Sequence, residues 1–169
     1  AGKAHENESE KRSGPYPVLI FYHGGGWVFA SMNATNKKMR TICSELQAVI
    51  VTVDYRLAPE FPFPAGTEDC YSALCWVTEN IGKYGGDSGR IVLSGDSAGG
   101  NLTAAVSLMA RDRGGPSVKG QIPIYPVIDL SSLETGSYRA FAEGHLLTRS
   151  AMKWLIDQYT PNVSDRGNP

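Results

Sequence analysis

Long apolar runs and an excess of charge of one sign are both absent from this sequence of 169 residues. No stretch approaches the ~18–20 apolar residues that a transmembrane helix needs, which predicts no membrane span. The 16 basic and 17 acidic residues leave a formal net charge of −1, so nothing favours binding to nucleic acid or to an anionic membrane. We therefore expect a soluble domain.

Cysteine is also scarce. The three cysteines, Cys43, Cys70 and Cys75, are odd in number and lie in helix-like segments. This favours reduced thiols packed as small hydrophobic groups over a disulfide or a metal site, and predicts a cytoplasmic location. Residues 1–14 are rich in charge and are expected to form a polar tail or linker. The sequence begins at Ala1, so a targeting segment ahead of it would not be visible.

What the sequence does contain is a regular alternation of strand and helix patterns. Strand patterns occupy 16–22, 48–53, 90–93 and 118–125, and helix patterns occupy 35–47, 66–80, 101–111 and 150–159. The run 48–53 is continuous and β-branched, which is typical of a strand buried on both faces. Repeated strand–helix–strand units predict an α/β fold with a mainly parallel sheet and helices on both faces. The expected core includes Leu74, Trp76, Val77 and Trp154.

The stretch 94–100 reads Ser-Gly-Asp-Ser-Ala-Gly-Gly and directly follows the apolar run Ile91–Leu93. A Gly-x-Ser-x-Gly pattern between a strand and a helix is typical of a nucleophile elbow, a sharp turn that presents the serine hydroxyl. Glycines on both sides leave room for a tight backbone, and the start of the following helix favours developing negative charge. This context predicts that Ser97 is a nucleophile.

A second turn, His23-Gly24-Gly25-Gly26-Trp27, follows the strand pattern at 16–22. Its glycines let backbone N–H groups approach a ligand, and the carboxyl ends of parallel strands meet at one edge of a sheet. We expect these N–H groups to face Ser97 and to stabilise an oxyanion, with the N–H of Ala98 as a further donor. A phosphate-binding loop is excluded because no Gly-x-x-x-x-Gly-Lys-Ser/Thr pattern occurs. For the glycines considered alone, a flexible loop remains the alternative.

Two acidic positions near these turns are interpreted as structural. In the block Asp54-Tyr55-Arg56-Leu57-Ala58-Pro59-Glu60, a buried and paired Asp54 and Arg56 would brace the site from behind. Asp96 precedes the nucleophile in the elbow and should point away from it. We therefore expect Asp96 to anchor a loop or a helix end rather than to transfer protons.

Together the three blocks resemble the signature motifs of the hormone-sensitive-lipase-like α/β-hydrolases, a family that includes bacterial carboxylesterases and arylacetamide deacetylases. The order and spacing of the blocks agree from about Pro15 to the last residue. The resemblance implies that Ser97 is the nucleophile. It also implies that Gly25, Gly26 and Ala98 supply the N–H groups of the oxyanion hole.

The same resemblance predicts a partial α/β-hydrolase fold. Residues 15–127 would form the central strands with the oxyanion loop and the elbow, and residues 128–169 would begin a cap insertion. The family's N-terminal strands and C-terminal strands would be missing. The strand at 118–125 would then present an unpaired apolar edge, which favours aggregation or pairing with another chain.

A base for the nucleophile is also lacking. In α/β-hydrolases the order along the chain is Ser, then Asp or Glu, then His, and the only histidine after Ser97 is His145. In relatives a similar segment opens a cap helix, so His145 is not expected to be the base. Asp129, Asp157 and Asp165 lie in or beside the same insertion without an acid-plus-base pattern. We expect a complementary C-terminal segment or chain to supply the Asp and His, and the 169 residues alone to be a poor esterase.

The leading functional hypothesis is a serine carboxylic-ester hydrolase that acts through an acyl-enzyme on short or medium acyl or aryl esters. This reaction implies no metal and no organic cofactor. Four residues are candidates for an apolar substrate pocket, with ordinary packing as the alternative: Tyr22, Trp27, Phe29 and Leu146. A second hypothesis is a non-catalytic small-molecule receptor of the gibberellin-receptor type, which resembles the same family. A third is an amidase or deacetylase with the same nucleophile and oxyanion hole.

Overall fold

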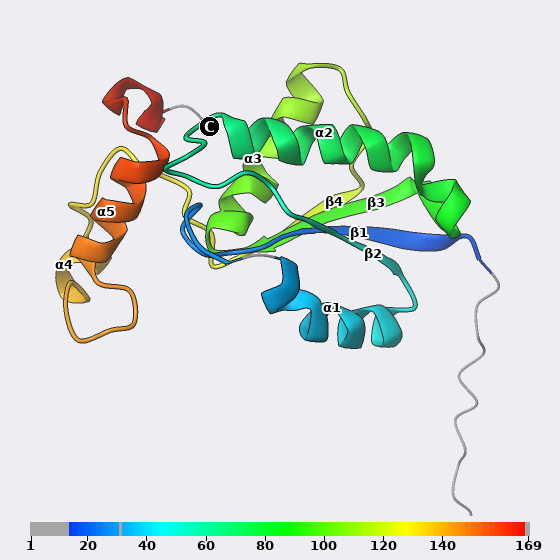
Figure 1. Cartoon of the computed structure of the whole chain (residues 1–169), viewed down its shortest axis with the longest axis horizontal. Coiled ribbons are helices and arrows are strands. Elements are labelled where there is room, and N and C mark those ends of the chain that lie inside the picture. Colours follow the sequence, from blue (N-terminus) through cyan, green and yellow to red (C-terminus); the bar gives the residue numbers. More distant parts are fainter. Residues whose placement is uncertain (1–13, 31, 168–169) are drawn as a thin grey trace, which may run out of the picture.

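Strands and helices alternate along the chain in the order that the sequence predicts (Figure 1). The computed structural model describes residues 14–30 and 32–167. The strands are β1 (Tyr16–Tyr22), β2 (Val49–Val53), β3 (Gly86–Asp96) and β4 (Gly120–Ile124). The helices are α1 (Met32–Leu46), α2 (Ala65–Asn80), α3 (Ala98–Asp112), α4 (Gly136–Ala140) and α5 (Arg149–Tyr159), with 3₁₀ turns η1 (Ile81–Tyr84) and η2 (Val163–Gly167). The tail predicted at 1–14 lies outside the described residues, apart from Gly14.

The four strands form one parallel sheet with the order β2-β1-β3-β4. Ile20 of β1 lies between Val51 of β2 and Leu93 of β3. Helix α1 covers one face of the sheet, and α2 and α3 cover the other (Figure 1). The predicted α/β fold, with helices on both faces of a parallel sheet, is confirmed. The carboxyl ends of all four strands therefore meet at one edge, where ligand sites form in such sheets.

The core lies between the sheet and the helices α2 and α3. Alternate residues of the two central strands point into it, as the two-residue period of a strand requires. The side chains that are at most 1% exposed include Val18, Ile20, Ile91 and Leu93 of the strands and Leu74, Val77, Leu102 and Val106 of the helices. Leu74 and Val77 thus occupy the core positions predicted for them.

Two tryptophans predicted in the core lie at the surface instead. Trp76 is 49% exposed and Trp154 is 48% exposed. Trp76 is two positions after Leu74, a spacing that turns its side chain away from the buried face of α2. Its ring lies 6.1 Å from that of Tyr84. The prediction for both tryptophans relied on hydrophobicity rather than on helical phase, and it was wrong.

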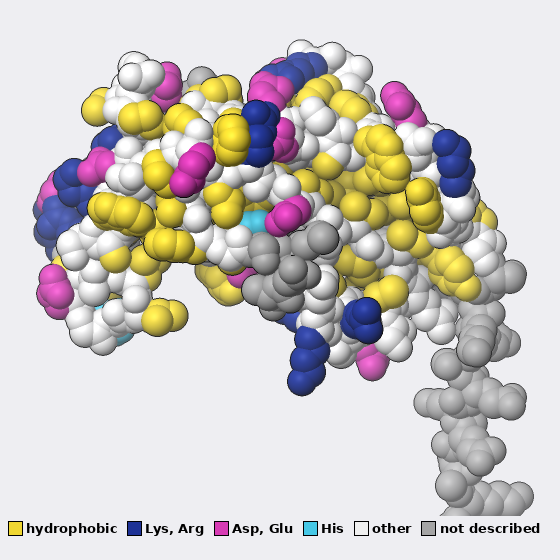
Figure 2. All heavy atoms as spheres, viewed as in Figure 1, with side chains coloured by type: hydrophobic (Ala, Val, Ile, Leu, Met, Phe, Trp, Pro, Cys, Tyr) yellow, Lys and Arg dark blue, Asp and Glu magenta, His cyan; other side chains and the backbone are white. Residues whose placement is uncertain are grey.

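Strand β2 is only partly buried along its whole length, although its β-branched sequence predicted burial on both faces. Its position in the sheet explains the difference, since within the described residues β2 pairs only with β1. Hydrophobic side chains gather on the molecular surface between α2 and β2 (Figure 2). The composition of β2 therefore indicates more burial than the described part of the chain provides.

The segment after β4 lies beyond the carboxyl ends of the strands and contains α4, α5 and η2 (Figure 1). Both of its α-helices begin at a capping threonine, the residue type that satisfies free N–H groups at a helix start. Thr135 Oγ1 accepts a hydrogen bond from the N–H of Tyr138, and Thr148 Oγ1 accepts one from Ala151. This segment is placed over the edge of the sheet where a site is expected.

Candidate active site

Ser97 occupies a strained turn between β3 and α3. Its φ of 56° and ψ of −117° lie outside the regions that residues with a side chain normally adopt. A side chain at Gly99 would overlap the carbonyl oxygen of Tyr22, and a Cβ at Gly95 would lie 2.6 Å from the same oxygen. The N–H of Ser97 donates to the carbonyl of Ile124 on β4, at 2.9 Å. The flanking glycines and this bond hold the predicted elbow in place.

Ser97 borders a cavity of about 500 Å³ beneath the segment that follows β4. The other residues that line it are Tyr125, Pro126, Val127, Ile128, Asp129, Ser132, Thr135, Ser137, Tyr138, Leu147 and Met152. None of these was predicted as a pocket residue. Their common signal is that they follow β4 at the carboxyl edge of the sheet, and that topological position was the only way to find them from the sequence.

The triple-glycine turn after β1 lies against the elbow. The N–H of Gly24 donates to Asp96 Oδ1 at 3.1 Å, and a Cβ on Gly24 would lie 2.8 Å from the carbonyl oxygen of Asp96. Gly25 and Gly26 have φ values of +120° and +62°. Within the residues that the structure describes, no hydrogen bond engages the N–H of Gly25 or Gly26. The N–H of Ala98 belongs to the first turn of α3, where helical N–H groups have no partner within the helix.

Asp96 joins this turn to β4. Its Oδ1 accepts from Gly24, and its Oδ2 accepts from the hydroxyl of Tyr125 at 3.3 Å. The negative charge of Asp96 is the main reason why the pKa of Tyr125 lies above its ordinary value. The carboxylate is thus engaged on both oxygens, which agrees with the anchoring role expected for it.

The block 54–60 braces the glycine turn from behind. Tyr55 is buried, stacks on His23 with ring centroids 4.3 Å apart, and donates its hydroxyl to the carbonyl of His23 at 2.7 Å. Burial raises the pKa of Tyr55 well above its ordinary value. The N–H of Ala58 donates to the carbonyl of Trp27 at 2.9 Å. Two hydrogen bonds and a ring stack therefore fix the path of the turn.

The ionic part of this brace differs from the prediction. Asp54 and Arg56 are exposed rather than buried. Arg56 pairs with Asp69 of α2, through Nε and Nη2 at 2.8 Å each, and its backbone N–H also donates to Asp69 at 3.0 Å. The guanidinium lowers the pKa of Asp69. The pair ties the loop after β2 to α2 at the surface.

Two of the four candidate pocket residues are packed inside the molecule. Tyr22 is fully buried and donates its hydroxyl to the carbonyl of Cys70 at 3.3 Å. Trp27 is 1% exposed, and its indole N–H donates to Asn101 Oδ1 at 3.3 Å. For Tyr22 and Trp27 the structure favours ordinary packing over pocket lining.

The other two candidates lie at the surface. Phe29 is 57% exposed, and Leu146 has its full surface exposed. The residue that follows, Leu147, is the one that borders the cavity of Ser97. A role in substrate binding stays a prediction for Phe29 and Leu146.

The described residues place no histidine at the Ser97 cavity. His23 is buried, with Nδ1 2.8 Å from the carbonyl of Gly24 and no hydrogen-bond partner for Nε2. His145 is exposed and meets the ring of Phe141 edge-on, with centroids 5.3 Å apart. Asp129 does border the cavity, where hydrogen bonds from Ser131 lower the pKa of its carboxyl.

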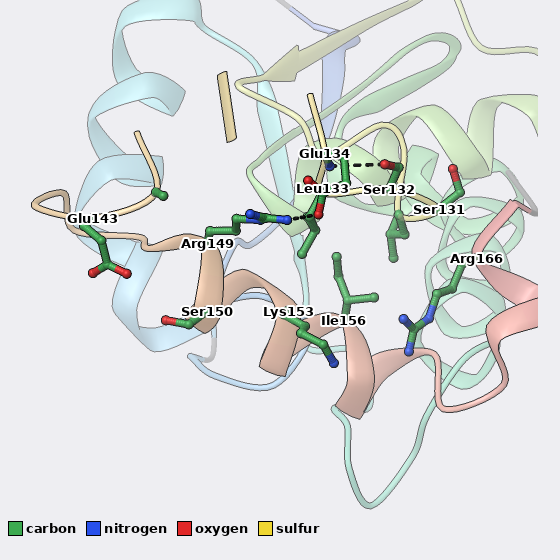
Figure 3. A pocket seen from close by; sticks show the side chains of 12 residues that line it. Ser131, Ser132, Leu133, Glu134, Glu143, Arg149, Ser150, Lys153, Ile156 and Arg166 are labelled. Atoms are coloured by element: carbon green, nitrogen blue, oxygen red, sulfur yellow. Dashed lines mark hydrogen bonds and ion pairs between the residues drawn. The ribbon is translucent and has the colours of Figure 1, made fainter. Parts of the chain in front are cut away.

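A second cavity of about 560 Å³ lies between the loop 130–134 and α5 (Figure 3). Three cations line it, and each is paired with a carboxylate. Arg149 pairs with Glu134, whereas Lys153 and Arg166 both pair with Asp157, at 2.6 Å and 2.7 Å. Ser97 does not border this second cavity. The cations that line the cavity are held in ion pairs with neighbouring carboxylates. The second cavity is therefore separate from the candidate nucleophile.

Residues 14–30 and 32–167 contain no group of three or more His, Cys, Asp or Glu side chains placed to hold a metal ion. They also contain no helix whose length and hydropathy would suit a membrane span.

Comparison with known proteins places this geometry among hydrolases. Residues 19–169 match a family described by its alpha/beta hydrolase fold. Carboxylesterase NlhH of Mycobacterium tuberculosis is 41% identical over 147 residues, which are 87% of this chain and 46% of that protein. An arylesterase of Saccharolobus solfataricus is 38% identical over 155 residues, which are 90% of this chain and 49% of that protein. The chain thus spans about half the length of the curated relatives that it matches.

Solved structures give the same result. A hyperthermophilic esterase from the archaeon Pyrobaculum calidifontis has a TM-score of 0.89 and 43% identity, covering 94% of this chain and 51% of that one. A thermostable esterase from Pseudomonas putida has a TM-score of 0.87 and 39% identity, covering 92% and 48%. The likeness extends over both the sheet and the segment after β4.

Proposed function

Because this chain belongs to the α/β-hydrolase family, as its three sequence blocks predict, we propose that it carries the nucleophile and the oxyanion hole of a serine carboxylic-ester hydrolase. The observation that carries the proposal is the strained turn at Ser97, next to a glycine turn whose Gly25 and Gly26 N–H groups are not engaged by the described residues. The esterases and carboxylesterases among its relatives support the reaction class.

In the proposed reaction, Ser97 Oγ attacks the ester carbonyl carbon while a base takes the hydroxyl proton. The carbonyl oxygen becomes an oxyanion and accepts hydrogen bonds from the N–H groups of Gly25, Gly26 and Ala98. One such donor typically contributes ~2.7–4 kcal/mol to lowering the barrier. The C–O bond to the alcohol then breaks, the alcohol leaves with the proton, and water releases the acid from the acyl-enzyme.

The base and its orienting carboxylate are proposed to come from a complementary C-terminal segment or chain. This proposal is supported by the position of His23, whose ring is buried against Tyr55, and of His145, which is exposed outside the Ser97 cavity. We propose short or medium acyl and aryl esters as substrates. A cavity of about 500 Å³ with both apolar and hydroxyl side chains suits such uncharged molecules.

A cytoplasmic location remains part of the proposal. Its support is that Cys43, Cys70 and Cys75 are all free thiols. Cys70 is fully buried, so it packs as a small hydrophobic group.

The test is active-site titration with a p-nitrophenyl phosphonate, which modifies the attacking oxygen and releases nitrophenol, and it is made on the protein together with the segment or chain that supplies the base. We expect one equivalent of label on Ser97 and none on the Ser97→Ala variant. Ser107→Ala is the matched control, because Ser107 lies on α3 and donates its hydroxyl to the carbonyl of Thr103, away from the cavity. Stoichiometric labelling of Ser97→Ala, or ester hydrolysis that survives in that variant, would refute the proposed function.

A separate assay tests the origin of the base. The 169 residues alone are expected to hydrolyse a p-nitrophenyl ester poorly. Full turnover by these residues, with Ser97 titrated by the phosphonate, would show that a base lies within them and would overturn the complementary-segment proposal alone.

A further inference from the structure

The glycine turn is in contact with one helix of the segment after β4, namely α5. A Cβ built on Gly26 would lie 2.6 Å from both methyl carbons of Leu155, so that side chain rests directly on the Gly26 Cα. The ring of Trp27 stacks on Tyr159 with centroids 4.6 Å apart and planes inclined by 2°. Residues 155 and 159 are four apart, so they lie on one face of α5 and meet consecutive residues of the turn.

A third contact extends this face outward. Phe29 stacks on Trp154 with centroids 5.9 Å apart and planes inclined by 17°. Both rings are about half exposed, whereas Leu155 is 7% exposed. The contact therefore has a buried centre at Leu155 and an aromatic rim.

Helix α5 is itself held firmly at the end that carries Tyr159. The Tyr159 hydroxyl and Thr67 Oγ1 of α2 are hydrogen-bonded at 2.8 Å, both within buried side chains. The carbonyl of Tyr159 accepts from the N–H of Phe63 at 2.8 Å, and the ring of Phe63 meets that of Tyr159 edge-on. The surface that α5 presents to the glycine turn is thus anchored to the body of the fold.

The anchoring of α5 matters because the backbone of a glycine rotates about φ and ψ more freely than that of any other residue. The φ of Gly26 is +62°, in a region that glycine adopts freely but does not prefer over its alternatives. The direction of its N–H is therefore set by what packs around it. Leu155 fills the space beside the Gly26 Cα where a Cβ would lie, so it limits rotation of the backbone at this residue.

We propose that Leu155 is a positioning residue for the oxyanion hole, and that α5 holds the Gly26 N–H in its productive direction. The inference rests on the proposed function, since it assigns a role relative to an oxyanion at Ser97. It makes α5 part of the catalytic arrangement without contact to the reacting atoms.

The matched pair of variants is Leu155→Ala and Ile156→Ala, made in the catalytically complete protein, that is, with the segment or chain that supplies the base. The two residues are adjacent on α5, and both are buried, at 7% and 1% exposure. Ile156 lines the second cavity and points into it (Figure 3), and the atoms nearest to a Cβ on Gly26 all belong to Leu155. Truncation of the side chain should lower the free energy of unfolding of both variants, whereas only Leu155→Ala opens space beside Gly26. Leu155→Met, which keeps the volume, is the conservative variant.

Three quantities separate positioning from folding. They are kcat and KM for p-nitrophenyl acetate, and Ki for a trifluoromethyl ketone, whose carbonyl adds Ser97 Oγ to give an oxyanion. Leu155→Ala is expected to lower kcat by about 10- to 100-fold with little change in KM, because a displaced donor is lost in the transition state. Its Ki for the ketone should rise by a similar factor. Ile156→Ala should keep both values near those of the wild type, and Leu155→Met should restore them.

Equal losses of kcat in Leu155→Ala and Ile156→Ala, or no loss in either, would overturn the inference. If Leu155→Ala does not fold, Leu155→Val and Ile156→Val form the substitute pair, with a several-fold difference in kcat and Ki expected in the same direction. Hydrolysis that persists in Ser97→Ala would instead refute the proposed function. The two failures are therefore distinguishable.

Discussion

At the scale of single residues, the candidate site depends on close backbone approach. Gly95 and Gly99 let the elbow come within contact distance of the carbonyl of Tyr22, at the end of the neighbouring strand β1. This contact brings Ser97 close to the glycine turn, because Tyr22 directly precedes that turn. The arrangement requires a positive φ at Ser97, and this conformation costs of order 1–3 kcal/mol in free energy.

We predict that Gly99→Ala disrupts this approach. Its methyl group would overlap the backbone oxygen of Tyr22, and a backbone atom cannot rotate away as a side chain does. The expected loss is ~1–3 kcal/mol in the free energy of unfolding, with phosphonate labelling of Ser97 slowed as well. Gly136→Ala is the control, since a Cβ there would meet nothing within 4 Å. Urea unfolding of both variants checks the prediction, and equal stabilities would contradict it.

The roles of residues could be predicted from the sequence where they depend on neighbouring residues in the chain. The burial or exposure of a side chain could not be predicted where it depends on tertiary packing. The strand–turn–helix context of Ser97 and the anchoring by Asp96 follow from neighbouring residues. By contrast, the burial of Trp27 depends on Tyr159, more than a hundred positions away. The exposure of Trp154 depends on which face of α5 meets the glycine turn. No local pattern contains that information.

At the scale of elements, the loop after β2 is tied to α2 by the pair Arg56–Asp69. The pair connects residues 13 apart with two side-chain hydrogen bonds and one from the backbone. It holds the same loop that supplies Tyr55 and Ala58 to the glycine turn. An ionic contact at the surface therefore supports the geometry of the site from a distance.

This pair predicts a pH dependence of stability. The pKa of Asp69 lies below its ordinary value of 3.8 because of Arg56. A carboxyl with a lowered folded-state pKa contributes stability above the ordinary value, and this contribution is lost as the pH falls through the lowered value. The difference in unfolding free energy between wild type and Asp69→Asn should therefore be largest above about pH 5 and narrow below pH 4.

Asp112→Asn is the matched control for this measurement. Asp112 is also paired, with Arg111, but the two are adjacent in the chain and largely exposed. Much of that attraction persists in the unfolded state, so its substitution should change the pH profile less. Urea unfolding between pH 3 and pH 7 distinguishes the two variants. A flat difference for Asp69→Asn across this range would contradict the role of the pair.

At the scale of the whole molecule, the sequence predicted the layers of the fold but not which strands lie outermost among the described residues. Alternating patterns and crossover rules predict the parallel sheet and the helices on both faces. Among the described residues, the order β2-β1-β3-β4 gives the β-branched strand β2 a single partner, whereas its composition is typical of a strand buried on both faces. Strand order depends on how the layers are assembled, and the composition of one strand does not encode it.

The other outermost strand, β4, leads to the last prediction. Within the described residues β4 pairs only with β3, and Ile122 on it is 56% exposed. An open edge that carries exposed apolar groups is a template for pairing with another strand. We expect the 169 residues, produced alone, to self-associate with rising concentration in sedimentation velocity experiments. Ile122→Lys should reduce this association, because a charge on an edge strand opposes pairing.

The control for that experiment is Val163→Lys, which adds the same charge at a residue 71% exposed on η2, outside the sheet. An equal reduction by both variants would mean that net charge, not the edge of β4, governs association. A monomer at every concentration would mean that the β4 edge is protected by its own geometry. If instead only Ile122→Lys restores the monomer, the edge of β4 is the surface through which the 169 residues associate.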